Sequence, residues 1–260
     1  MVSLRNRFVV RDVAAAHNVT AVDLHLAQFN IATLRHPMDH PETASFVALL
    51  DDVNRLAESS PGFVWRHGID SRKVDDPPVY DNPLTLVNAS VWESLGALRD
   101  FAYKGLHRDV FRRRGDWFVS SEAVMWWLPA GTLPTLAECT ARVEFLPRHG
   151  PSPYAFETGQ RFPQLVVIPR LADHPDVATM LARSDRDRLH DDAAFYIAYV
   201  DGAPCACGAY HRIDGADGAA ELQHLWADPM LPDLQLGAAV LATLETAARA
   251  GGCREVRLAT

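Results

Sequence analysis

Short runs of alternating apolar and polar residues occupy the first half of the chain, and amphipathic stretches separate them. The alternating runs, which are typical of strands, are LHLAQFNIATL (24–34), FVWRHGI (63–69), LTLVNASVW (84–92) and EAVMWWLPAG (122–131). Helical spacing covers residues 38–62, the stretch from Glu93 to Phe118 with a bend near Gly105, and residues 135–146. This order predicts a βαββαβ unit plus a helix, which is an α+β, ferredoxin-like fold with helices on one face.

The second half repeats the alternation of strand and helix patterns in a different order. It reads as a strand at 165–170, a helix near 175–183, a hairpin at 194–213, a strand at 219–229, a helix at 235–252 and a last strand at 254–260. The stretch 149–163 between the halves is rich in Pro and Gly, which is typical of a junction. We therefore expect three parts: a leader or tail (1–23), a first domain (24–160) and a second domain (165–260).

Composition narrows the class of protein. The chain has 260 residues, 48% of them apolar, and a net charge of -8, which is ordinary for a globular protein and disfavours nucleic acid as a partner. No apolar run has the length of a membrane span, and Arg11 and Asp12 interrupt the apolar N-terminal stretch. We expect a cytoplasmic protein without a membrane contact. The 4 cysteines lack CxxC spacing, so we expect packing thiols and no metal site.

Polar side chains interrupt the strands of the first domain at alternating positions, close to large aromatic residues. Aromatic walls with a few hydrogen-bonding groups are typical of a pocket for a small ligand. The candidate pocket residues are Asn30, Trp65, Arg66, Asn88, Ser90, Trp92, His107 and Trp126. The alternative is that these groups satisfy one another, or a dimer partner, in a structural core.

His107 is the candidate residue that could take the largest number of different chemical roles. A histidine at this helical position can act as a general base, or bind a metal or haem iron. The alternative is a structural hydrogen-bond donor. The run Arg112–Arg114 could bind an anion, although such a run is usually a solvated face.

The first domain resembles a known family. The motifs are GFVWR (62–66), NASVWES (88–94), HRDVFRRRGDWF (107–118), MWWLPAGTLPTLAE (125–138) and GPSPYAF (150–156). They resemble a bacterial domain-of-unknown-function family in the dimeric α/β-barrel superfamily. The resemblance implies a homodimer whose two sheets close into a barrel around a small-molecule ligand, and it implies no reaction. Superfamily relatives include haem-binding and cofactor-free monooxygenases, so haem or oxygen chemistry is an expectation by analogy.

The second domain resembles the GNAT family of acyl-CoA-dependent N-acetyltransferases, as a partial mixed α/β sheet. In that family a glycine-bearing loop holds the diphosphate of CoA with free main-chain N–H groups at a helix N-terminus. The matching stretch here is Pro232–Gly237, in which only Gly237 fits the glycine pattern. Pro232 lacks an N–H, Gln235 replaces a glycine, and Asp233 adds a negative charge. Each departure opposes binding of acetyl-CoA.

The resemblance also assigns roles to residues of this sequence. It implies that Leu225, Trp226 and Ala227 pair with the pantetheine arm, while Leu236, Gly237 and Ala238 face the diphosphate. Glu221 matches a position that often carries the general base. With a turn near 214–218, His211 would lie beside Glu221 on the neighbouring strand, so the pair could deprotonate an amine. The alternative is an ordinary cross-strand polar pair. The family fold continues beyond the last strand, so we expect an unpaired sheet edge there.

Three hypotheses remain open from the sequence. The chain is an acyl-CoA N-acyltransferase joined to a ligand-binding barrel, or a non-catalytic dimeric binding module. The third hypothesis is a haem- or oxygen-dependent activity around His107. The sequence names no substrate for either domain.

Overall fold

A computed structural model describes residues 23–68, 81–103, 105–184, 189–213 and 218–259. The contacts divide these residues into two compact units, which meet in the sequence between Leu133 and Pro134. The first unit begins at Leu24, and the expected leader lies outside the described residues except for Asp23. The division precedes the expected junction at 149–163, because helix α4 groups with the second unit.

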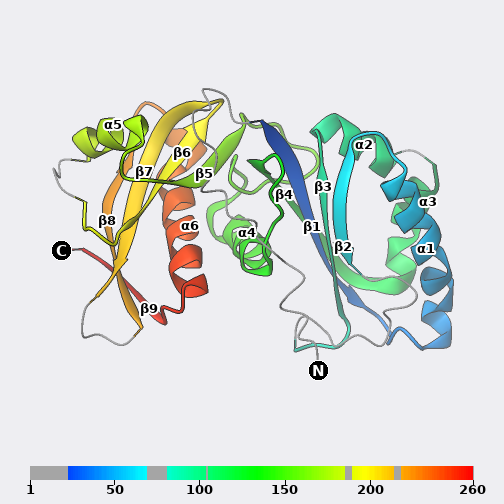
Figure 1. Ribbon diagram of the computed structural model, residues 1–260. Helices are drawn as coiled ribbons and strands as arrows, with labels where there is room; N and C mark the ends of the chain where they lie inside the picture. The colour runs from blue at the N-terminus through cyan, green and yellow to red at the C-terminus, as the bar shows by residue number, and fades with distance from the viewer. Residues whose placement is uncertain (1–22, 69–80, 104, 185–188, 214–217, 260) are drawn as a thin grey trace. The chain divides into compact units, whose positions relative to one another are not determined.

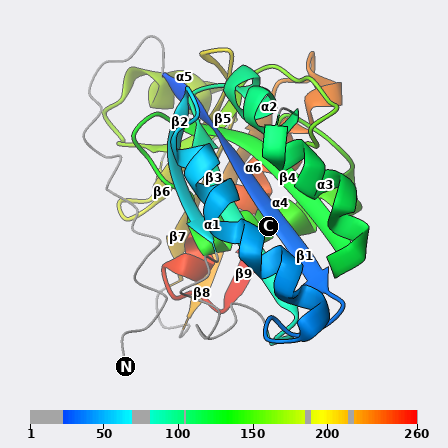
Figure 2. The ribbon, with the colours of Figure 1, turned by 90° about the vertical axis from the view of Figure 1, so that its right-hand side faces the viewer.

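The first unit is an antiparallel sheet with helices on one face. The strands are β1 (Leu24–Leu34), β2 (Phe63–Gly68), β3 (Thr85–Trp92) and β4 (Phe118–Pro129), in the order β2-β3-β1-β4. The helices are a 3₁₀ turn (Pro41–Thr43), α1 (Ala44–Glu58), α2 (Leu95–Tyr103) and α3 (Gly105–Trp117). Figure 2 shows α1, α2 and α3 on the same side of this sheet. The predicted ferredoxin-like fold is confirmed, and the helix break falls at the expected Gly105.

Aromatic residues fix the helices on the sheet. Phe46 of α1 packs against Trp117 and Phe118, with ring centroids 5.7 and 5.1 Å apart. The Trp117 indole N–H donates to Ser45 Oγ at 2.9 Å. On the other side of the helical layer, Phe101 of α2 stacks on the fully buried Trp92 at 5.1 Å. The helical spacing noted in the sequence therefore corresponds to the faces that bury these rings.

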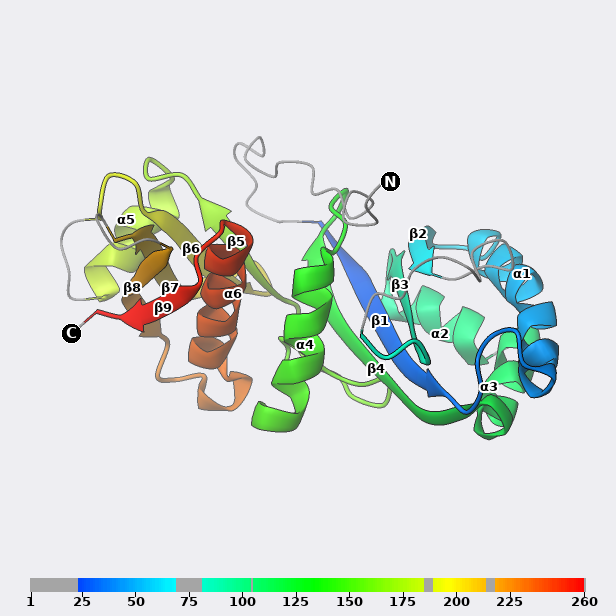
Figure 3. The same ribbon diagram turned by 90° about the horizontal axis from the view of Figure 1, so that it is seen from below.

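The second unit is a five-stranded mixed sheet between helices. Its elements are α4 (Leu136–His149), β5 (Leu165–Arg170), α5 (Pro175–Arg183), β6 (Ala194–Val200), β7 (Ala203–Arg212), β8 (Ala219–Ala227), a 3₁₀ turn (Pro232–Leu234), α6 (Leu236–Ala250) and β9 (Glu255–Leu258). The strand order is β5-β6-β7-β8-β9, antiparallel except for β9, which runs parallel to β8. Helices α5 and α6 lie on opposite faces of the sheet (Figure 1), and α4 lies beside α6 (Figure 3).

Close packing of α6 on the sheet depends on Gly208 in β7. A Cβ atom at this position would lie 2.7 Å from Leu244, 2.8 Å from Leu225 and 2.9 Å from Val240. All three distances are shorter than real Cβ contacts, so a larger residue would force these side chains to shift. The opposite strand bulges here, because the pairing shifts between Cys207 and Ala209.

The bulge in β8 centres on His224, whose φ of 56° lies in the left-handed region. The Cys207 thiol donates to the main-chain oxygen of His224 at 3.4 Å. Burial raises the pKa of this thiol to about 12, so it stays protonated and keeps the contact. The bulge interrupts the pairing of β7 and β8, which resumes between Cys207 and Trp226 before β8 ends at Ala227.

No helix among the described residues is long and apolar enough to cross a membrane.

Candidate functional site

The N-terminus of α6 presents main-chain N–H groups without a protein acceptor. The first hydrogen bond of the helix runs from the Ala239 N–H to the Gln235 oxygen at 3.0 Å. The N–H groups of Leu236, Gly237 and Ala238 therefore come before the first helical hydrogen bond. Gln235 makes no capping bond with its side chain. Within the described part of the chain, no acceptor is bonded to these three N–H groups. Gly237 is exposed, so an anion can reach them.

Gln235 keeps the backbone shape that a glycine would give the loop. Its φ of 53° places it in the left-handed region, directly after the 3₁₀ turn Pro232–Leu234. Its side-chain amide N–H donates to the main-chain oxygen of His149 at the end of α4, at 2.9 Å. This bond holds the loop against α4 and offsets part of the left-handed strain. The departures from the glycine pattern predict weaker CoA binding, and the left-handed turn at Gln235 forms without a glycine.

Gly237 has no structural reason to be glycine. A Cβ atom there would meet only Ala227 Cβ, at 3.9 Å, which is ordinary van der Waals contact. A helical glycine costs about 1 kcal/mol relative to alanine. The absence of a side chain at Gly237 therefore leaves space on the solvent side of the α6 N-terminus, next to the open N–H groups.

Among the described residues, one edge at the end of β8 has no strand partner. The Asp228 N–H donates to the Cys205 oxygen at 2.9 Å, so by alternation the main-chain groups of Ala227 point away from β7. Pairing with β9 reaches only Leu222, whose oxygen accepts from the Ala259 N–H at 2.9 Å. The open edge thus begins beyond Leu222 and runs to the start of α6.

Leu225 and Trp226 belong to this open stretch, with Leu225 42% exposed. The guanidinium of Arg183, the last residue of α5, lies 5.1 Å from the Trp226 ring centroid. An arginine at this distance makes a cation–π contact and adds positive charge beside the open edge. No motif in the sequence pointed to Arg183.

The structure brings His211 and Glu221 together. They are partners across β7 and β8, with His211 Nε2 3.9 Å from a Glu221 oxygen. The side chain of Gln223 reaches His211 Nδ1 at 3.3 Å. Their neighbour Tyr210 packs toward α6, so His211 and Glu221 face the side of α5. Six residue steps of extended strand, about 20 Å along β8, separate Glu221 from Ala227, so this pair lies well away from the α6 N-terminus.

Two further residues join this pair that sequence reasoning missed. The rings of His190 and His211 stack, with centroids 4.3 Å apart and planes 6° apart. Asp192 lies 2.8 Å from His190 Nδ1. That hydrogen bond is the main cause that lowers the pKa of the Asp192 carboxyl. The only sequence signal was the run His190-Asp191-Asp192 before β6, and nothing in it indicates a long-range contact with β7.

In the first unit, the polar residues of the sheet mainly satisfy one another. The Trp92 indole donates to Ser90 at 3.0 Å, Ser90 donates to Gln28 at 3.3 Å, and Gln28 donates to Asn30 at 3.4 Å. Asn88 pairs in register with Asn30. These side chains form one internal row, which is the alternative considered from the sequence.

The remaining expected pocket residues do not gather around this row. Arg66 joins the same face, but its guanidinium lies 2.7 Å from Glu58 of α1. Trp65 and Trp126 pair with Val91 and Ala27, so alternation places both on the opposite face. His107 lies within α3, but its side chain is outside the described residues. The structure therefore divides the expected pocket residues between the two faces of the sheet, and a pocket formed by them stays a prediction.

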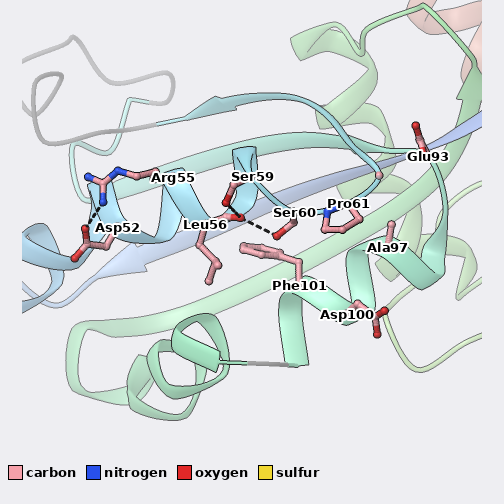
Figure 4. Close-up of a pocket in the computed structure, with 11 residues that line it drawn as sticks. Asp52, Arg55, Leu56, Ser59, Ser60, Pro61, Glu93, Ala97, Asp100 and Phe101 are labelled. Atoms are coloured by element: carbon pink, nitrogen blue, oxygen red, sulfur yellow. Dashed lines mark hydrogen bonds and ion pairs between the residues drawn. The ribbon is translucent and has the colours of Figure 1, made fainter.

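A cleft of about 860 Å³ lies instead between the end of α1 and α2 (Figure 4). Its apolar wall includes Leu56 and Phe101, and Phe101 stacks on Trp92 of the polar row. The lining residues are Asp52, Arg55, Leu56, Ser59, Ser60, Pro61, Gly62, Glu93, Ala97, Asp100 and Phe101. The size is ordinary for a small-molecule site.

The charges of the cleft favour a cation. Asp52, Glu93 and Asp100 carry carboxylates, and Arg55 is the one cation among the described residues that line the cleft. Arg55 is bonded to Asp52 at 2.8 Å. Among the described residues, Glu93 has no ion-pair partner. The carboxyl end of α1 adds a partial negative charge.

The described residues contain no group of three or more His, Cys, Asp or Glu side chains that could hold a metal ion. All 4 cysteines are free and buried. In Cys139, burial is the main cause that raises the thiol pKa. These thiols act as packing groups, as the spacing suggested.

Comparison with protein families gives two matches. Residues 25–168 match the family described as Domain of unknown function (DUF3291). Residues 164–260 match the Acetyltransferase (GNAT) family. Both resemblances proposed from the sequence are thus confirmed. A comparison with curated proteins gives no match.

Solved structures match each unit weakly. A putative acyl-CoA N-acyltransferase from Klebsiella pneumoniae subsp. pneumoniae has 22% identity and a TM-score of 0.32, covering 36% of this chain and 70% of its own. SnoaB from Streptomyces nogalater, a cofactor-independent oxygenase, has 18% identity and a TM-score of 0.32, covering 42% and 97%. Glucosamine-6-phosphate N-acetyltransferase from Arabidopsis thaliana has 13% identity and a TM-score of 0.30, covering 37% and 82%. None of these comparisons supports the expectation of haem.

Proposed function

Because the chain belongs to the family described as Domain of unknown function (DUF3291), which names no reaction, we propose a function that rests on its GNAT-like second unit. We propose that this unit binds an acyl-CoA thioester and transfers the acyl group to an amine. The observation that carries the proposal is the set of three open N–H groups where α6 begins, inside the segment that matches the GNAT family.

The helix N-terminus supports binding of the CoA diphosphate. Free N–H groups and the positive end of the helix dipole together favour an anion. Gly237 leaves the space into which a phosphate oxygen can approach the main chain. Leu236 and Ala238 supply the flanking donors.

The open edge of β8 supports binding of the pantetheine arm. That arm carries amide groups, and an extended amide chain can pair with a strand edge as an added strand does. Ala227 directs its main-chain groups to this edge, and Leu225 offers an exposed apolar surface beside it. The arm would run from the α6 N-terminus along β8 toward Glu221.

Two features oppose binding and limit its strength. Asp233 is exposed on the 3₁₀ turn before α6 and repels a diphosphate, although solvent screens an exposed charge. Pro232 removes one donor from the loop. We therefore expect acetyl-CoA to bind in the micromolar range, weaker than a loop with the full glycine pattern would bind it.

Calorimetric titration of the full chain with acetyl-CoA tests the proposal. Measurable heat with one site per chain, weakening as salt rises, is the expected result because the contact is ionic. Desulfo-CoA, which keeps the diphosphate and lacks the thiol, should bind equally well. Absence of heat at high micromolar ligand would remove the acyl-CoA assignment.

A second candidate function belongs to the first unit, and the cleft between α1 and α2 favours it. We propose that this unit binds a small organic cation with an apolar body, since carboxylates border an apolar wall. Ligand-observed NMR with 2-phenylethylamine should show binding, and neutral 2-phenylethanol should bind much more weakly. Glu93→Gln should weaken the amine, whereas Glu122→Gln, an exposed carboxylate on β4 outside the cleft, should not. Equal binding of both probes would contradict the proposal.

A homodimer through the first unit, expected from the barrel resemblance, also remains a proposal. Sedimentation equilibrium of the full chain should give twice the mass of 28.7 kDa. A single-chain mass at high micromolar concentration would contradict it.

A further inference from the structure

The Asp192–His190 pair has the arrangement of an oriented base. Asp192 holds His190 Nδ1 at 2.8 Å, which places the proton on Nδ1 and leaves the lone pair on Nε2. The same hydrogen bond lowers the pKa of the Asp192 carboxyl, so the carboxylate is ionised at neutral pH. A base whose ring is fixed by a third group is the recurring pattern of activated proton transfer. His190 is also 56% exposed, so a substrate can reach it.

His211, the histidine expected from the sequence, is less suited to accept a proton. Its Nδ1 faces the Gln223 side-chain amide nitrogen at 3.3 Å, and an amide N–H can only donate. That contact occupies the lone pair on Nδ1 and places the ring proton on Nε2, toward Glu221 at 3.9 Å. The side chain of His211 is only 10% exposed. The Gln223 contact and the burial of the side chain fix this ring, which acts as a support.

The stacked geometry couples the two rings. The ring centroids are 4.3 Å apart and the ring planes differ by 6°, so the rings lie face to face. The His211 ring therefore restricts tilting of the His190 ring. A proton gained by His190 places a positive charge on the stack. Glu221, 37% exposed beside His211, can offset positive charge that develops on the stack.

We propose that His190, oriented by Asp192 and supported by His211, accepts the proton from the amine during acyl transfer. This inference rests on the proposed acyl-CoA function of the second unit. The amine nitrogen bonds to the thioester carbonyl carbon, and one of its protons passes to His190 Nε2. The C–S bond then breaks with its electron pair on sulfur. The CoA thiolate takes the proton from the imidazolium, which leaves an amide, a free thiol and a neutral imidazole.

Histidine modification with diethyl pyrocarbonate, read by peptide mass spectrometry on the full chain, tests the assignment without knowledge of the acceptor. The reagent acylates an accessible imidazole lone pair. We expect His190 to react at least about tenfold faster than His211, and saturating acetyl-CoA to slow His190 several-fold because the acyl group covers it. Nitrogen-15 NMR of the histidines should show Nδ1–H in His190 and Nε2–H in His211, assigned with His190→Gln and His211→Gln.

The first unit offers a matched control. His36 and His40 also stack at 4.3 Å, and acetyl-CoA should leave their modification unchanged. Asp192→Asn should abolish the tautomer preference of His190 without unfolding the chain, because both side chains are exposed.

The outcomes separate this inference from the proposed function. If calorimetry shows that acetyl-CoA binds but His190 is not protected, or His211 reacts first, the assignment of His190 is overturned and the binding site stands. If acetyl-CoA gives no heat, the proposed function fails and this inference fails with it.

Discussion

Helices α4 and α6 lie side by side in the second unit, but their N-termini are treated in opposite ways. Thr135 and Glu138 close α4 with a complete capping box, in which Thr135 Oγ1 accepts from the Glu138 N–H at 3.1 Å and a Glu138 oxygen accepts from the Thr135 N–H at 2.8 Å. Helix α6 starts after a left-handed Gln235 with no side-chain cap. A cap contributes about 1 kcal/mol, so the chain leaves that stabilisation unused at α6.

The difference separates structural helix ends from a candidate ligand site. Helix α5 is capped as well, with His174 Nδ1 accepting from the Asp176 N–H at 3.2 Å. Helix α1 also lacks a side-chain cap, but among the helix starts whose side chains the structure describes, only that of α6 combines this with an exposed glycine that no neighbour requires. Donors that the protein does not satisfy are available to an anion.

We expect the largest effect on stability and on acetyl-CoA binding from a substitution that displaces α6. Gly208→Ala places a methyl group 2.7–2.9 Å from three side chains of α6 and β8, so these side chains, or α6 itself, must shift away from β7. We expect a loss of about 1–3 kcal/mol in the free energy of unfolding, together with loss of acetyl-CoA binding. Urea unfolding and calorimetry measure both. Unchanged stability would mean that α6 does not pack on Gly208 as described.

Removing the cap of α4 should lower the stability by a smaller amount and leave acetyl-CoA binding unchanged, in contrast to a change at α6. Thr135→Ala deletes the side-chain half of the capping box, and we expect a loss of about 1 kcal/mol in the free energy of unfolding. Because the α4 cap holds no ligand, acetyl-CoA affinity should stay within twofold of the original. Thr179→Ala, which removes an exposed hydroxyl inside α5, is the control. A large fall in affinity would show that the two helix ends are not functionally distinct.

Removing the charge before α6 should give the smallest effect. Asp233→Asn takes away an exposed negative charge next to the open N–H groups. We expect acetyl-CoA to bind about two- to fivefold more tightly, since exposed charges near a helix end contribute about 0.3–1 kcal/mol. Asp173→Asn, an exposed acid ahead of α5, should leave the affinity unchanged. Weaker binding in Asp233→Asn would place the diphosphate elsewhere.

Periodicity was sufficient to predict most of the fold. The strand patterns gave both sheets, and the bend near Gly105 falls where α3 begins. Alternation also predicted that His211 would lie beside Glu221, which the register bears out. Such features depend on local spacing, and local spacing is what a sequence displays directly.

The site depended on features that spacing does not encode. Nothing local indicates that Gln235 adopts a left-handed conformation, because its side chain is held by His149 of a distant helix. The contact of His190 with His211 is equally long-range. In the first unit, strand parity separated Trp65 from Arg66, although the two are adjacent in the sequence. The cleft between α1 and α2 arises from helix packing and was not anticipated.

Replacing Gly237 by alanine tests the central claim most directly, because stability and binding should change in opposite directions. A Cβ atom at 237 meets nothing closer than 3.9 Å, so Gly237→Ala should raise the free energy of unfolding by up to about 1 kcal/mol. Its methyl group should lower acetyl-CoA affinity at least tenfold by blocking approach to the helix N-terminus. Gly115→Ala in α3, which has open space around it, should stabilise the chain and leave affinity unchanged. Equal acetyl-CoA affinity in Gly237→Ala and the original chain would contradict the account.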